Sequence, residues 1–466
     1  MPSTTVAKRR LPRAAPRVEP QATTGGTRTR VAQPARSAGG KALSILVVLF
    51  LIGLLIPWKI YIGPMRMSGY RLVLIAAILP CLVMWITGRA GRIRLPDIAV
   101  ILYPVWCGIS LTVLHGFATA WQPAGILFLE TAGTYFLARC MIRTADNFYA
   151  MAKVLFLIVV GLLPFAIFEA LTQVNVAMKL FSSVMPSYPV SEADPRWGLR
   201  RVQAVFEHPI LYGVCASSAV AMTFLVLGYG QSLVKRSFKT GIVAFAAFLS
   251  LSAGPITAVF AQLGLVAWDT VLRNNPLRWK LLLICVAAMW MLISAVSNQS
   301  VPAFYMTHFS FDPASAYFRL LIWEFGTNSV AHNPLFGTGL GEWLRPDWMP
   351  PSIDMFWLTH AVYYGLPAAF LIGVLFFSAY LPVALKSGLP DRILAYKTAY
   401  LICMTGYFLV GWTVHFWNAS YALFVFLIGS GLWILDYQET PAAPRKSGAR
   451  SALSASRSKH SGTPPE

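Results

Sequence analysis

The chain has 466 residues, of which 56% are hydrophobic and only 12% are charged. Its mean hydropathy is +0.60. Charged residues make up about a quarter of an ordinary globular protein, so this composition excludes a soluble enzyme. The formal net charge of +20 is concentrated in the terminal segments and in short stretches between apolar runs. The charge therefore indicates how the chain is oriented in a membrane, and it does not indicate a polyanionic binding partner.

Long uncharged runs predict the membrane-spanning segments in chain order. A spanning helix needs about 20 apolar residues, so the longer runs must hold two spans or a span and a loop. We predict about 12 transmembrane helices between residues 42 and 436, which defines an all-α polytopic membrane protein. The runs are 42–58, 72–88, 98–129, 154–168, 209–234, 241–268, 281–311, 355–385 and 398–435.

The two ends of the chain have a different composition. Residues 1–41 are rich in Pro, Ser, Thr, Gly and Arg, with nine Lys or Arg against one acid, Glu19. Such a segment cannot build a core, so we predict disordered basic tails at 1–41 and 437–466. The positive-inside rule places both tails in the cytoplasm. Binding to anionic membrane lipid remains open, whereas the lack of aromatic residues in the N-terminal tail disfavours nucleic acid.

Alternation of the basic stretches leaves two sizeable loops on the outer side, at about 172–208 and 298–354. This topology requires the run 241–268 to form two short helices, broken near Gly254 and Pro255. Proline and glycine together are typical of such a break.

The second outer loop carries the first candidate site. Asp312 is a suitable N-cap and Pro313 suits the first position of a helix. Arg319 and Trp323 lie on the side of this helix opposite its apolar face. The arginine predicts a clamp for a phosphate-bearing substrate. An amphipathic helix lying on the membrane surface is the alternative.

The stretch that follows ends this helix and keeps the backbone open. Asn333 and Pro334 stop the helix just after His332, and Gly337 and Gly339 then allow close approach of a ligand to the backbone. No βαβ pattern surrounds these glycines, which excludes a dinucleotide-binding loop.

The first outer loop carries a second group of cations. Arginine on the outer side runs against the positive-inside bias, and guanidinium groups match the oxygens of a diphosphate. Pairing with nearby acids or with lipid head groups is the alternative. The arginines are Arg196, Arg200 and Arg201, and the acids are Glu192, Asp194 and Glu207.

Four further titratable residues are candidates. His208 begins the sixth predicted span and is either a base or a hydrogen-bonding anchor. Glu130 lies at membrane depth, where an acid is either functional or paired with a neighbouring helix. Asp354 and His360 either cap a helix or bind a substrate hydroxyl.

Metal and redox motifs are missing from the sequence. All six cysteines lie in or beside predicted spans, and no C-x-x-C, D-x-D or H-E-x-x-H occurs. We therefore predict no metal, no cofactor and no disulfide.

Together these residues resemble the bacterial O-antigen ligase/polymerase family. Arg319, Trp323 and the stretch N-P-L-F-G-T-G-L-G at 333–341 resemble its signature, and Arg201 with 206–213 resembles the end of its first outer loop. The resemblance is strongest to the exopolysaccharide polymerases. Further similar stretches are 354–358 and 364–367, whereas 251–254 lacks the arginine that many members carry there.

The resemblance implies a C-type glycosyltransferase-like helical fold in the bacterial inner membrane, with both outer loops periplasmic. It implies metal-independent, inverting glycosyl transfer from an undecaprenyl-diphosphate-linked oligosaccharide. Chain-length regulators or export proteins are possible partners. The chain lacks the histidine–asparagine pair of the ligases near Asp354, which favours a polymerase over a ligase. A non-enzymatic flippase or transporter is a further alternative.

The resemblance also implies roles for individual residues. Arg319, His208 and Asp354 are the expected catalytic residues, and His332 is a third candidate base. The expected substrate-binding residues are Arg196, Arg200, Arg201, Trp323, His332, Gly337, Gly339, His360 and Glu130.

Overall fold

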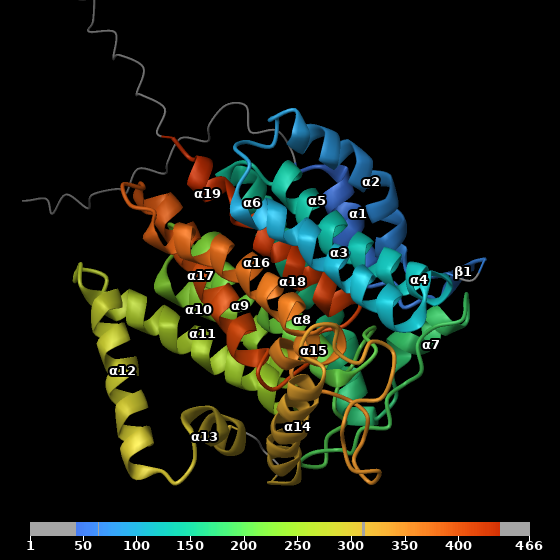
Figure 1. Ribbon diagram of the computed structural model, residues 1–466. Coiled ribbons are helices and arrows are strands. Elements are labelled where there is room, and N and C mark those ends of the chain that lie inside the picture. Colours follow the sequence, from blue (N-terminus) through green and yellow to red (C-terminus); the bar gives the residue numbers. More distant parts are fainter. Residues whose placement is uncertain (1–42, 64, 310–312, 439–466) are drawn as a thin grey trace, which may run out of the picture. The chain divides into compact units, whose positions relative to one another are not determined.

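The computed structural model describes residues 43–63, 65–309 and 313–438. These residues form helices and a single two-stranded hairpin (Figure 1). The prediction of an all-α polytopic membrane protein is confirmed. In lipid a helix satisfies its own backbone hydrogen bonds, which explains why the uncharged runs fold in this way.

The first half of the chain contains α1 (Ile45–Gly53), β1 (Ile60–Ile62), β2 (Met65–Met67), α2 (Gly69–Ile86), α3 (Leu95–His115), α4 (Phe117–Phe128), the π-helical turn η1 (Leu129–Gly133), α5 (Thr134–Met141), α6 (Ala145–Thr172), α7 (Val176–Ser182), α8 (Pro209–Ser217), α9 (Val220–Met222) and the π-helical turn η2 (Thr223–Leu227). The second half contains α10 (Leu233–Phe248), α11 (Ala253–Val271), α12 (Arg278–Val296), α13 (Val301–His308), α14 (Pro313–His332), α15 (Phe356–Tyr364), α16 (Leu366–Leu385), α17 (Asp391–Val410), α18 (Ala419–Ser430) and α19 (Trp433–Asp436).

Eight helical segments of the described residues are long and apolar enough to cross a membrane, fewer than the 12 predicted. The remaining runs fold as shorter or more polar helices. Helix α1 has only nine residues, and α10 carries basic residues in its first half. The eight segments are α2, α3, α6, Pro209–Leu227, α12, α16, α17 and Ala419–Asp436.

The break predicted in the run 241–268 is confirmed. Helix α10 ends at Phe248 and α11 begins at Ala253, just before Gly254 and Pro255. Residues 249–252 form the turn between the two helices, and Leu251 adopts a positive φ of 45° within it.

The two predicted outer loops contain most of the irregular chain. Residues 173–208 hold only α7, and residues 297–355 hold α13, α14 and an irregular stretch at 333–355. The predicted N-cap Asp312 lies outside the described residues. The same holds for the predicted tails, apart from Tyr437 and Gln438.

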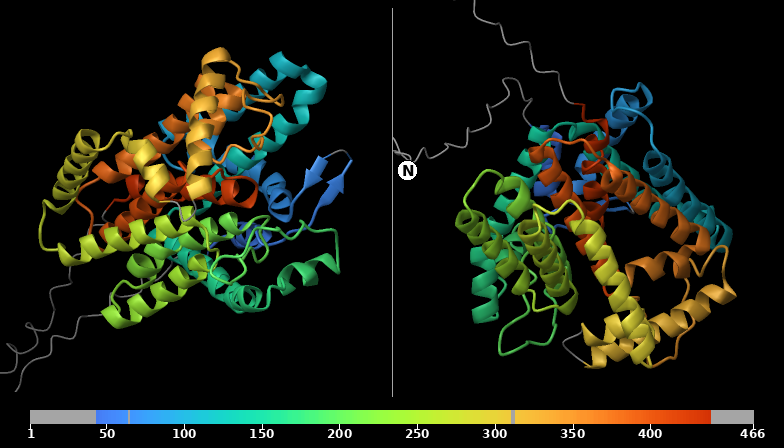
Figure 2. Two further views of the ribbon diagram at one scale, coloured as in Figure 1. Left: turned by 90° about the horizontal axis from the view of Figure 1, so that it is seen from below. Right: turned by 90° about the vertical axis from the view of Figure 1, so that its left-hand side faces the viewer.

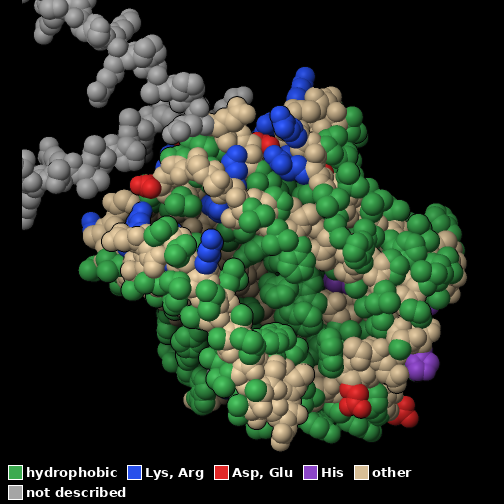
Figure 3. All heavy atoms as spheres, turned by 60° about the vertical axis from the view of Figure 1, so that its left-hand side comes forward, with side chains coloured by type: hydrophobic (Ala, Val, Ile, Leu, Met, Phe, Trp, Pro, Cys, Tyr) green, Lys and Arg blue, Asp and Glu red, His purple; other side chains and the backbone are tan. Residues whose placement is uncertain are grey.

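Both consecutive helices and helices distant in sequence pack side by side. Helix α3 packs against α4 and α16, α5 against α18, α11 against α17, and α14 against α15 (Figure 1). Helix α12 differs, because none of its residues is buried, and it runs along the outside of the other helices (Figure 2). On the face shown in Figure 3, hydrophobic side chains cover most of the surface and Lys and Arg gather along one edge. This distribution is typical of a protein embedded in lipid.

Candidate active site

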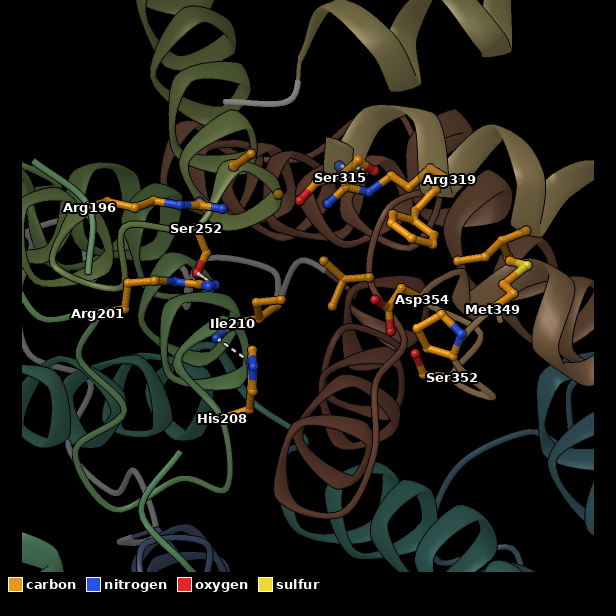
Figure 4. Close-up of a pocket in the computed structure, with 16 residues that line it drawn as sticks. Arg196, Arg201, His208, Ile210, Ser252, Ser315, Arg319, Met349, Ser352 and Asp354 are labelled. Atoms are coloured by element: carbon orange, nitrogen blue, oxygen red, sulfur yellow. Dashed lines mark hydrogen bonds between the residues drawn. The ribbon is translucent and has the colours of Figure 1, made fainter. Parts of the chain in front are cut away.

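A cavity of about 300 Å³ lies where several separate segments meet. Its charged and titratable lining residues are Arg196, Arg201, His208, Arg319 and Asp354 (Figure 4). They come from the end of the first predicted outer loop, from α14 and from the stretch before α15. The structure thus brings together residues that the sequence had placed in two loops.

Arg196 and Arg201 are held against the turn between α10 and α11. Arg196 donates to the carbonyl of Leu251 (2.7 Å), and Arg201 donates to Oγ of Ser252 (3.0 Å). Neither arginine forms an ion pair within the described part of the chain. Burial, assisted by the neighbouring Arg196, lowers the pKa of Arg201 to about 10. Such crowding of cations favours a bound anion.

Arg319 reaches the cavity from the other side. It lies in α14, one turn after Ser315, which also lines the cavity. Its Nε donates to the carbonyl of Thr413 (3.3 Å). Figure 4 shows its guanidinium directed toward the space that Arg196 and Arg201 face. An anion in the cavity would therefore meet cations on two sides.

His208 is the N-cap residue of α8. Its Nδ1 accepts a hydrogen bond from the backbone N–H of Ile210 (3.2 Å). Burial, followed by the charge of Arg201, lowers the pKa of His208 to about 4. The ring is therefore neutral at pH 7, with its proton on Nε2, because Nδ1 is the acceptor. This tautomer makes Nε2 a hydrogen-bond donor.

Asp354 is the only acidic residue among the described residues that line the cavity. It precedes α15 and is half-buried. Burial raises the pKa of its carboxyl, and the nearby Arg319 opposes this shift. A carboxylate with a raised pKa takes up a proton more readily near neutral pH.

Seven predicted site residues lie outside the cavity, namely two glycines and five residues with larger side chains. Arg200 pairs with the buried Glu169 (3.5 Å), and Trp323 packs against a neighbouring tryptophan, with ring centroids 6.1 Å apart. His332 bonds through Nδ1 to a backbone carbonyl of its own helix (2.9 Å). His360 is buried and bonds to the hydroxyl of a tyrosine in α3 (2.7 Å). Glu130 is buried in an ion pair, the packing alternative left open by the sequence.

Gly337 and Gly339 pack the loop after α14 against other elements. Both have a positive φ, of 68° and 62°. A Cβ on Gly337 would lie 2.5 Å from the backbone of Tyr363, and one on Gly339 would lie 2.3 Å from Nε2 of His115. Only glycine fits at either place. The close approach predicted for these glycines is made to α15 and α3, and neither glycine lines the cavity.

Most lining residues had no assigned role in the sequence, and Ser252, Ser315 and Val414 are three of them. Ser252 lies in the stretch 251–254, whose only noted feature in the sequence is the absence of an arginine that many members of the resembled family carry. Ser315 precedes Arg319 by four residues, a helical spacing that could have indicated it. Val414 lies between α17 and α18, inside an uncharged run that gave no signal.

The fold and the cavity define a multi-pass membrane protein with a cationic site. A family model described as O-antigen ligase matches residues 240–372, which is less than a third of the chain and includes Arg319 and Asp354. This match supports the predicted resemblance to the O-antigen ligase/polymerase family over that segment, and members of that family are membrane glycosyltransferase-like enzymes. A search of curated proteins found no match.

Proposed function

We propose that this protein polymerises lipid-linked polysaccharide repeat units by inverting glycosyl transfer from undecaprenyl diphosphate at the periplasmic face. The observation that carries this proposal is the convergence of Arg196, Arg201 and Arg319 on one cavity that also contains Asp354. A site with three guanidinium groups and one carboxylate suits an anionic leaving group and a neutral nucleophile.

The leaving group explains the cations. When a glycosyl diphosphate donor reacts, negative charge grows on the diphosphate oxygens. Prearranged donors lower the energy of that transition state more than that of the ground state. Guanidinium groups bind such oxygens with paired, charge-assisted hydrogen bonds. We assign this role to Arg201 and Arg319, with Arg196 as the third cation.

The transfer itself is a single displacement. A hydroxyl oxygen of the acceptor sugar attacks the anomeric carbon of the donor from the side opposite the diphosphate. The bond from that carbon to the diphosphate oxygen breaks, and its electron pair leaves with the diphosphate. The hydroxyl proton passes to the enzyme base, and the configuration at the anomeric carbon inverts.

The two lining candidates for the base differ in their hydrogen bonding. His208 accepts a bond at Nδ1, so its Nε2 carries the proton and has no free lone pair. It therefore serves as a donor to a substrate oxygen. The carboxylate of Asp354 has no hydrogen-bond or ion-pair partner among the described residues, and its pKa is raised, so we assign it as the general base.

Ligation is the second candidate, because the matching family model is described as O-antigen ligase. A ligase moves a finished glycan to a different acceptor, whereas a polymerase adds repeats to a lipid-linked chain. The stretch around Asp354 lacks the histidine–asparagine pair of the ligases, and we therefore favour polymerisation.

We also propose that both termini are cytoplasmic and that the cavity faces the periplasm. Ser183 and Ser300 are exposed residues of the two predicted outer loops. In a cysteine-free background, cysteines at these positions should react with a membrane-impermeant thiol reagent in spheroplasts. Protection there, with reaction in inverted vesicles, would contradict this orientation.

Reconstitution tests the reaction. The purified full-length protein in proteoliposomes should convert a radiolabelled, undecaprenyl-diphosphate-linked repeat unit into a ladder of longer lipid-linked chains. Arg319→Ala should abolish the ladder, whereas Arg392→Ala, which removes an arginine paired with Asp146 (2.6 Å) remote from the cavity, should not. Failure of the wild-type protein to form any chain longer than one repeat would contradict polymerisation.

A further inference from the structure

The segment 411–418, between α17 and α18, contacts both sides of the cavity. The carbonyl of Thr413 accepts a hydrogen bond from Nε of Arg319 (3.3 Å). Val414 lines the cavity, and its carbonyl accepts from the backbone N–H of Phe356 at the start of α15 (3.1 Å). The segment therefore supports Arg319 and is bonded to the helix that follows Asp354.

The same segment reaches the His208 side. The rings of Trp417 and His208 lie 6.4 Å apart, centroid to centroid. Nε1 of Trp417 donates to the carboxylate of Glu207 (2.7 Å), the residue directly before His208. The position of this histidine thus depends on the conformation of the segment.

Asn418 ends the segment and anchors it to buried polar side chains of other elements. Its Nδ2 donates to both carboxylate oxygens of Glu207 (2.7 and 2.8 Å), and its Oδ1 accepts from Arg71 (3.0 Å). Arg71 is itself paired with Glu130 (2.9 Å), and both of these side chains are almost fully buried. The anchor is therefore a buried ion pair on α2 and η1, joined to the site through one amide.

The backbone of Asn418 is strained. Its φ is 49° and its ψ is −123°, a region in which glycine is the unstrained residue. Although Asn418 is the N-cap residue of α18, its side chain makes no capping bond. The side chain thus contributes through Arg71 and Glu207, and it does so at a cost in backbone energy.

We propose that Asn418 is a positioning residue of this site. It holds the 411–418 segment in the one conformation that sets Arg319 and His208 at their places around the cavity, with the Arg71–Glu130 pair as its fixed support. This inference rests on the proposed glycosyl transfer and extends it to residues that do not touch the substrate.

Asn418→Gly separates positioning from stability. Glycine relieves the backbone strain and removes the amide that links Arg71 to Glu207. In purified full-length protein, Tm should therefore stay within a few degrees of the wild-type value or rise, whereas kcat for chain extension should fall at least tenfold, with KM changed less than threefold. Gln173→Gly is the matched control, because Gln173 also has a positive φ (63°) and lies at the exposed end of α6. Both of its constants should remain unchanged.

Asn418→Asp gives a second comparison that does not depend on the glycine variant. It keeps the oxygen that faces Arg71 but sets a carboxylate against Glu207, so kcat should fall at least as far. Asn418→Gly with wild-type kcat would overturn the positioning role alone. A loss of kcat matched by a fall in Tm of more than ten degrees would also overturn it, in favour of a purely structural role. A wild-type protein that extends no chains would overturn the proposed function, and this inference with it.

Discussion

Arg71, which is buried, and Arg201, which is half-buried, show two ways in which this protein uses a guanidinium group shielded from solvent. Arg71 donates to Glu130, to the backbone carbonyl of Arg66 and to Asn418, so it is satisfied on three sides by the protein. Arg201 has one hydrogen bond, to Ser252, and its Nε has no partner among the described residues. The first arginine is part of the framework, and the second is available to a ligand.

The difference shows which arginines to expect in a site. A buried charge without a carboxylate partner is costly, and its pKa shifts accordingly. The structure pairs Arg71 tightly yet leaves Arg201 beside a second arginine, with its pKa lowered to about 10. We interpret the clustered arginines of the cavity as lowering the folding stability of the protein while raising its affinity for a diphosphate.

The largest expected effect follows from removing Arg319. Arg319→Ala should lower polymer formation by roughly 1000-fold, because loss of a donor to a developing oxyanion costs about 10²- to 10³-fold. Arg319→Lys should restore little, since an ammonium group cannot grip two oxygens. Polymer would be measured in membranes with equal amounts of protein. Full rescue by lysine would indicate that Arg319 only anchors α14 at the membrane surface.

Replacing Asp354 should have the next largest effect. Asp354→Asn should lower kcat by about 10²-fold or more, the usual contribution of a general base. In the wild-type protein, kcat/KM should fall as the pH drops through the raised pKa of Asp354, and the residual activity of the variant should lack this acid limb. If kcat/KM of Asp354→Asn still fell at low pH as in the wild-type protein, the titrating group would be a residue other than Asp354.

The same substitution makes a prediction about stability. The folded protein binds the proton of Asp354 more tightly than the unfolded chain does, so the buried carboxylate costs stability above its folded pKa. Asp354→Asn should therefore raise Tm at pH 8. The gain should shrink as the pH falls below the raised folded pKa and vanish only well below the ordinary Asp pKa of 3.8, where both states are protonated. A lower Tm at pH 8 would contradict the assigned shift.

Matched substitutions of Arg71 and Arg201 test the comparison between a framework arginine and a ligand-binding arginine. Arg71→Met should leave Glu130 buried and unpaired, at a cost of about 3–5 kcal/mol, and should lower Tm strongly. Arg201→Met should leave Tm unchanged or higher, because it removes a crowded cation, yet weaken binding of farnesyl diphosphate about tenfold. Equal losses of Tm in both variants would show that Arg201 is also part of the framework.

The smallest effect is expected at His208. With a pKa of about 4, this ring does not titrate between pH 5 and 8, so His208→Phe should lower kcat only by about three- to tenfold and leave the acid limb of the pH profile in place. Loss of the acid limb in this variant would make His208 the base instead of Asp354.

The sequence predicted the fold class and five residues that line the cavity because their signals are local. Long uncharged runs define helices in lipid, and the break before Gly254 follows from the turn preferences of glycine and proline. Eight described segments have the length and hydropathy of a span, against 12 predicted spans. Hydropathy does not show that α1 ends after nine residues, or that the helix after α4 passes through a π-helical turn carrying the buried Glu130.

The rest of the site depends on contacts between distant segments. Arg200 and Arg201 are neighbours, but only Arg201 faces the cavity. Arg200 is held away because it pairs with Glu169, a residue of α6. The sequence predicted no role for Asn418. Its role depends on Arg71 and Glu207, which lie 347 and 211 residues away in the chain, and no periodicity or motif indicates such a pairing.

The lipid-linked glycans of a strain that carries Arg319→Ala test the central claim most directly. A polymerase that lacks its diphosphate clamp leaves the assembly and flipping of repeats intact. Single repeats on undecaprenyl diphosphate should therefore accumulate, and an added periplasmic glycosidase should degrade them. Long glycans on the lipid would contradict polymerisation and indicate a ligase, and glycosidase-resistant single repeats would indicate a flippase.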